Sequence, residues 1–189
     1  MKKLLIAAGC VLALTTACDS NTTTKTEGGD HDHPEHREEV RDTKPAEGEA
    51  AEALKLGTAN FAVLMGAYIS LKESLVESNA EAAAAAGQAF GIFAKTQGDA
   101  FAGMAETAES IAASEDIEEQ RAAFHTLSKD MYTVAKANES KAVVYQQYCP
   151  MAFDNAGATW LSMEEEIKNP YFGDAMLTCG NVAETIVAE

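Results

Sequence analysis

The stretch that decides the fold is residues 116–138, DIEEQRAAFHTLSKDMYTVAKAN. Residues at alternating gaps of three and four along it lie on one face of a helix. These positions are Ile117, Gln120, Phe124, Leu127, Met131, Val134 and Asn138. The pattern predicts an amphipathic helix over the whole stretch, and other elements must cover its apolar stripe.

Two earlier stretches carry helical patterns of the same kind. The first runs from about Glu49 to Ser78, with the stripe Leu54, Gly57, Phe61, Leu64, Tyr68, Leu71 and Leu75. Ser78 and Glu81 then have the spacing of a capping box, which predicts a second helix reaching about Ala112. Its inner side would hold Phe90, Phe93, Phe101, Met104 and Ile111. Its glycines at 87, 91, 98 and 103 either let a neighbouring helix approach closely or mark a break.

The last fifty residues have a different composition, with β-branched and aromatic residues punctuated by proline and glycine. Residues 143–149 and 159–161 are predicted to pair as a hairpin around a turn at 154–157. Ser162 and Glu165 have the spacing to cap one short helical turn before Pro170. The predicted fold is therefore all-α, an up-down helical bundle with a C-terminal strand and loop cap, forming one domain over 49–189.

Charge and motifs exclude several classes of function. Of the 189 residues, 30 are acidic and 14 are Lys or Arg, so the formal charge of −16 disfavours nucleic acid as a partner. No Walker loop, dinucleotide-binding glycine pattern or nucleophile elbow is present. We therefore expect no enzymatic activity.

The N-terminus has the features of an export signal. Residues 1–17 combine the positive start of Lys2 and Lys3 with an apolar stretch and then small residues before Cys18. This segment resembles a bacterial lipoprotein signal, which implies that Cys18 is diacylated and becomes the first mature residue. The expected location is the cell envelope, facing the periplasm, with contact to the membrane through the lipid anchor.

Residues 18–48 are predicted to be a disordered tether, because they contain too few apolar residues to offset the entropy of ordering. Three of the four histidines, His31, His33 and His36, lie within it. Imidazole tracts of this kind bind Zn, Ni or Cu(II) weakly when the chain must be ordered by the ion. The alternative is a solvated linker whose histidines only titrate.

The C-terminal cap carries two sulfur pairs. In an extended chain Cys149 and Met151 share a face, and Met176 and Cys179 share a face on a helical turn. Together they form a soft four-sulfur set suited to Cu(I). The alternative is a Cys149–Cys179 disulfide, which would stabilise an exported cap by about 3 kcal/mol and leave both methionines as packing residues. A thiol redox protein is a third interpretation.

His125 stands one position from the apolar stripe of the third predicted helix. It is either a further metal ligand, a donor that orients such ligands, or a partly buried histidine satisfied by a neighbour. Sequence alone leaves these alternatives open.

Several blocks of the cap resemble a bacterial family, domain-of-unknown-function family 3347. They are YCPMA at 148–152, WLS at 160–162, IKNPYFG at 167–173 and MLTCG at 176–180. Weaker similarity lies in the helices, so that the whole resemblance covers roughly Leu54 to Val182. Members of this family occur as small lipoproteins and as C-terminal extensions of copper and silver efflux adaptor subunits. The resemblance implies a Cu(I) chaperone or buffer that works beside a heavy-metal efflux adaptor or pump. The competing expectation is a disulfide-stapled interaction domain that binds no metal.

Overall fold

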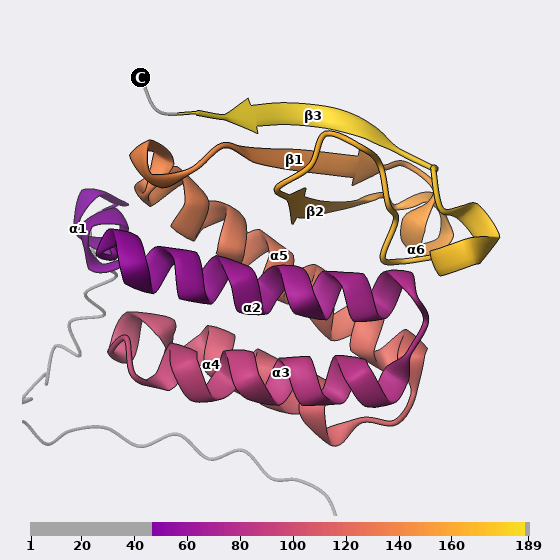
Figure 1. Ribbon diagram of the computed structural model, residues 1–189, viewed down its shortest axis with the longest axis horizontal. Helices are drawn as coiled ribbons and strands as arrows, with labels where there is room; N and C mark the ends of the chain where they lie inside the picture. Colours follow the sequence, from indigo (N-terminus) through magenta and orange to yellow (C-terminus); the bar gives the residue numbers. More distant parts are fainter. Residues whose placement is uncertain (1–46, 188–189) are drawn as a thin grey trace, which may run out of the picture. The chain divides into compact units, whose positions relative to one another are not determined.

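The computed structural model describes residues 47–187; Cys18 and the tether histidines His31, His33 and His36 lie outside the described residues. The described part is a helical bundle with a small sheet on one side of it (Figure 1). Its helices are α1 (Glu47–Ala53), α2 (Thr58–Val76), α3 (Ala80–Lys95), α4 (Ala102–Ala113), α5 (Ile117–Ala137) and α6 (Ala152–Asn155). None of the helices within 47–187 is long and apolar enough to cross a membrane.

The long helices pack in chain order, α2 on α3, α3 on α4 and α4 on α5 (Figure 1). The predicted stripes of the first and third helical stretches form much of the core. In α2 the buried stripe residues are Phe61, Leu64, Tyr68, Leu71 and Leu75. In α5 they are Gln120, Phe124, Leu127, Met131 and Val134. The up-down helical bundle predicted from the periodicity is confirmed.

The first predicted helix is interrupted, which its sequence pattern did not show. α1 ends at Ala53 and α2 begins only at Thr58. The cause is Asn138, whose Oδ1 accepts from the Leu56 backbone N–H at 2.8 Å and whose Nδ2 donates to the Leu54 carbonyl at 2.9 Å. The buried Asn138 side-chain amide therefore satisfies hydrogen-bonding groups of the backbone that links the two helices.

The second predicted helix is broken in two, and its glycines explain both the break and the packing. Gly98 has a φ of +102°, which favours glycine, and separates α3 from the short 3₁₀-helix η1 (Asp99–Phe101) and α4. A Cβ on Gly87 would lie 3.0 Å from the Ala108 carbonyl oxygen of α4. Both roles that the sequence left open therefore occur: Gly98 marks a break, and Gly87 allows α4 to approach closely.

The predicted capping box at the start of this second helix is wrong. Asn79 caps α3, because its Oδ1 accepts from the Ala82 N–H at 3.0 Å. Ser78 lies one residue earlier with a φ of 53°, and its hydroxyl accepts a hydrogen bond from Arg121 instead. Buried Arg121 also donates to the carbonyls of Leu75 and Pro170, so its guanidinium joins the end of α2 to the cap.

The cap contains an antiparallel sheet of β1 (Val144–Cys149), β2 (Ala158–Ser162) and β3 (Asn181–Ile186), with β1 in the centre. The predicted hairpin corresponds to β1 and β2, while β3 was not predicted. β2 packs on α5. Two short 3₁₀-helices, η2 (Glu139–Lys141) and η3 (Gly173–Met176), flank these strands in sequence.

The helical turn predicted after Ser162 does not form, and residues 163–166 are bends. Buried Gln147 accounts for this difference. Its Nε2 donates to the carbonyls of Glu164, Glu165 and Glu166 at 3.0, 3.1 and 3.1 Å. Carbonyls that converge on one side-chain amide cannot also align along a helix axis.

Candidate functional site

Two cysteines from separate elements meet at the end of the sheet. Cys149 is the last residue of β1 and is fully buried, and Cys179 lies half-buried in the loop between η3 and β3. Their sulfur atoms are 2.8 Å apart, and the two thiols are not bonded. β1 and β3 bring them together, because the antiparallel register pairs Tyr148 with Asn181.

The loop that carries Cys179 is fixed by Asn169. This residue is fully buried, and its Nδ2 donates to the Cys179 carbonyl at 2.8 Å. Its Oδ1 accepts from the Tyr171 N–H at 2.8 Å, and its own N–H donates to the Leu177 carbonyl at 2.8 Å. One buried amide therefore holds both sides of the loop, and sequence reasoning did not single it out.

The sulfur distance has a chemical meaning. It exceeds a covalent S–S bond of about 2.05 Å, and it is shorter than the separation of about 3.7 Å between two sulfurs bound to one ion at ~2.3 Å in tetrahedral geometry. The hydrogen bond with Cys149 and, secondly, burial raise the pKa of the Cys179 thiol. The pair is thus a close dithiol whose sulfur separation lies between that of a disulfide, which only a two-electron oxidation would form, and that of two ligands on one ion.

Two methionines of the predicted sulfur set line one hollow of about 450 Å³ beside the cap. Met151 is 46% exposed, and Met176 is half-buried at the end of η3. Phe153, Asp154 and Tyr171 also line the hollow, whereas neither cysteine does. The two thiols therefore meet at the end of the sheet, whereas the two thioethers line the hollow.

The premise that Cys149 and Met151 share a face of an extended chain is wrong. The strand ends at Cys149, and Met151 has helical backbone angles, φ −92° and ψ −11°. The chain turns at this point, so Cys149 is buried while Met151 is exposed. On the other side, the Cys179 N–H donates to the Met176 carbonyl at 3.0 Å, in agreement with the predicted turn.

His125 contacts the wall of the same hollow from α5. Its ring centroid lies 5.1 Å from that of Phe153 and 6.1 Å from that of Tyr171. Its Nδ1 is buried with no hydrogen-bond partner among residues 47–187. Burial and, secondly, the charge of Lys129 lower its pKa. The neutral imidazole thus has a buried nitrogen without a hydrogen-bond partner in the described part of the chain.

An unusual turn forms the rim of the hollow. Phe153, Asp154 and Asn155 have φ values of 52°, 56° and 69°, all in the left-handed region. Such residues cost about 1–3 kcal/mol each where the surroundings hold them in place. The turn signal at 154–157 was visible in the sequence, but its strained conformation was not.

No cluster of three or more His, Cys, Asp and Glu side chains arranged for a metal ion is found within 47–187. Besides these four residue types, methionine thioethers can also bind a soft metal ion. The methionines of the hollow are the nearest such donors in sequence to the two thiols.

Comparison with known proteins identifies one family. Residues 64–142 match the family described as protein of unknown function DUF3347. The match covers the helices from α2 to the end of η2 and stops before Cys149. No curated protein and no solved structure matches this chain. The family resemblance predicted from the sequence is thereby confirmed over residues 64–142.

Proposed function

We propose that this chain is a lipid-anchored, periplasm-facing domain that binds Cu(I) as a chaperone or buffer beside a heavy-metal efflux system. The observation that carries the proposal is the 2.8 Å contact between the Cys149 and Cys179 thiols. Cu(I) prefers soft sulfur ligands, and two cysteines on adjoining elements supply the first two.

The dithiol needs to open only a little to hold an ion. Two sulfurs bound at ~2.3 Å in tetrahedral geometry are about 3.7 Å apart, so the present pair must separate by about 1 Å. Cys179 is the partner expected to move, because it lies in a loop, whereas Cys149 is fixed in the central strand. Asn169 limits that movement through its bond to the Cys179 carbonyl.

The thioethers of Met151 and Met176 would complete the ligand set. Methionine has three rotatable bonds, so its sulfur can change position by rotation of the side chain. Exposed Met151 follows Cys149 by two residues, and Met176 precedes Cys179 by three. His125 is a further candidate ligand beside the same hollow, where its ring packs at a tilt of 42° against Phe153.

Metal binding by this pair is coupled to proton release. The raised pKa of Cys179 keeps its sulfur protonated at neutral pH, and a thiolate is the form that binds metal. The apparent affinity for Cu(I) should therefore rise with pH as the Cys179 thiol loses its proton more readily.

The same distance favours a second function. The two unbonded sulfurs, 2.8 Å apart, are closer than van der Waals contact. A disulfide-containing oxidant of the envelope would join them by accepting two electrons and two protons from the thiols. The resulting disulfide would fix the loop against β1. In that case the chain is a disulfide-stabilised interaction domain of the envelope that binds no metal.

A competition titration separates the two functions. The reduced protein and its Met151→Leu and Met176→Leu variants compete for Cu(I) with a soluble chelator, and Met163→Leu serves as control. Met163 is also exposed but does not line the hollow. Leucine keeps the apolar volume, so a lost ligand alone should weaken binding by about tenfold or more, while the control matches wild type. Equal, weak competition by all four proteins, with no free thiols after purification without reductant, would establish the disulfide function instead.

A further inference from the structure

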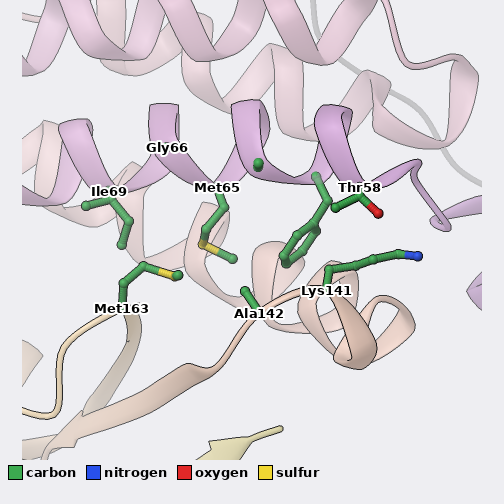
Figure 2. Close-up of a pocket in the computed structure, with 9 residues that line it drawn as sticks. Thr58, Met65, Gly66, Ile69, Lys141, Ala142 and Met163 are labelled. Atoms are coloured by element: carbon green, nitrogen blue, oxygen red, sulfur yellow. The ribbon is translucent and has the colours of Figure 1, made fainter. Parts of the chain in front are cut away.

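A second hollow is lined by nine residues, none of which is a cysteine. It is an apolar groove of about 250 Å³ between the first half of α2 and the segment that joins η2 to β1. Figure 2 shows Met65 entering it from α2 and Met163 entering it from the end of β2. Phe61 and Ile69 complete its apolar walls.

The wall that α2 contributes to the groove includes two small residues, Ala62 and Gly66. Gly66 stands in the middle of the helix, where glycine costs about 1 kcal/mol relative to alanine. A Cβ at this position would meet no atom within 4 Å, whereas Gly87 and Gly91 are required by close contact with α4. Helix packing therefore does not explain Gly66, but the open space beside it is part of the groove.

The groove is polar at one end only. Lys141 and Thr58 lie at the same end, and Met163 and Ile69 lie at the other (Figure 2). Lys141 is exposed and forms no ion pair with any residue between 47 and 187. Met163 is 43% exposed although it borders an apolar space. An apolar groove with one cation at its end is complementary to an amphiphile with an anionic head.

We propose that this groove binds a single fatty acid, with the alkyl chain between Met65 and Met163 and the carboxylate beside Lys141. The groove has a volume of about 250 Å³. It admits one extended alkyl chain. Flexible methionines adapt their shape to such a chain. The site goes beyond the proposed metal function, because neither cysteine lines the groove.

The test uses the full-length chain carrying Cys18→Ser, so that no acyl chain of its own competes. Dodecanoate displaces a fluorescent polyene fatty acid from the protein, and dodecanol serves as the uncharged probe of equal length. We expect one dodecanoate per chain. Gly66→Leu should weaken binding by about tenfold or more because it fills the groove. Ala89→Leu, which places the same leucine side chain at an exposed position of α3, should leave it unchanged.

The charge is tested separately. Lys141→Met keeps an unbranched side chain one atom shorter and removes the charge, and it should weaken dodecanoate binding by about threefold, as for an exposed ion pair, without changing dodecanol binding. Ala62→Leu replaces Gly66→Leu if circular dichroism shows that the latter does not fold. Equal binding by wild type and the filled variant, no saturable binding below the micelle concentration, or an equal effect of Lys141→Met on acid and alcohol would each overturn the proposal.

Discussion

The side-chain amide of Asn169 donates a 2.8 Å hydrogen bond to the main-chain oxygen of Cys179, ten residues later. The same amide accepts from the Tyr171 N–H, so it ties the loop before η3 to the loop after it. The position of the Cys179 sulfur against Cys149 thus depends on a residue with no sulfur chemistry of its own.

Replacement of Asn169 should therefore affect both stability and the thiols. Asn169→Ala removes buried hydrogen bonds and leaves the Tyr171 N–H without its acceptor, so the free energy of unfolding should fall by about 1–3 kcal/mol. Reaction of the reduced protein with a thiol reagent should become faster, because the Cys179 loop is released. Urea unfolding and timed thiol labelling measure the two effects. Asn181→Ala, an exposed amide beside the same loop, should change neither.

The hydroxyl of Tyr68 connects α2, α5 and the sheet through buried hydrogen bonds. Tyr68 Oη accepts from the Leu161 N–H at 3.0 Å and contacts Ser128 Oγ at 2.7 Å, and burial raises the pKa of this phenol. Tyr68→Phe leaves the buried Leu161 N–H unpaired and should cost about 1–3 kcal/mol in urea unfolding. Tyr132→Phe, whose partly buried hydroxyl donates to Glu184, should cost less. Equal losses of unfolding free energy in both variants would show that the buried Tyr68 hydroxyl contributes no more than the partly buried one.

The helices were predictable because their periodicity is local, as in the buried stripe Phe124, Leu127 and Met131. The interruption before α2 was not predictable, because its cause is Asn138, more than eighty residues away in sequence. Likewise β3 is an edge strand defined by its pairing with β1 rather than by its own pattern.

The candidate site was predictable only in part, for a related reason. The residue types and spacing indicated a pairing of Cys149 with Cys179, and the structure brings them to 2.8 Å. The turn that exposes Met151 and the buried amide of Asn169 depend on tertiary contacts, which no spacing rule contains.

The lowered pKa of His125 predicts a pH dependence of stability. Its pKa in the folded protein lies below the unfolded value of about 6.5, so the unfolded state binds the proton more readily. The stability from neutral His125 is present in full above about pH 6.5 and is lost as the pH falls through the folded pKa. Melting temperatures of wild type and His125→Gln, taken between pH 7.5 and 5, should converge towards acid pH. A constant difference would contradict this assignment.

The predicted anchor is tested at Cys18. Cys18→Ser should move the protein from the membrane fraction to the soluble fraction, because a single acylated residue supplies the attachment. Incorporation of a labelled fatty acid into wild type alone provides the direct measurement. Unchanged membrane association without any label would remove the lipoprotein prediction.

The most direct test of the metal proposal is X-ray absorption at the copper edge, on the reduced full-length protein loaded with one Cu(I) per chain and passed through a desalting column. A site formed by Cys149, Cys179 and the methionines predicts a first shell of sulfur alone at ~2.3 Å. Cys149→Ser should replace part of that shell with a lighter atom or release the copper. A first shell of nitrogen, as the tether histidines would give, or the loss of all copper on the column would contradict the proposal.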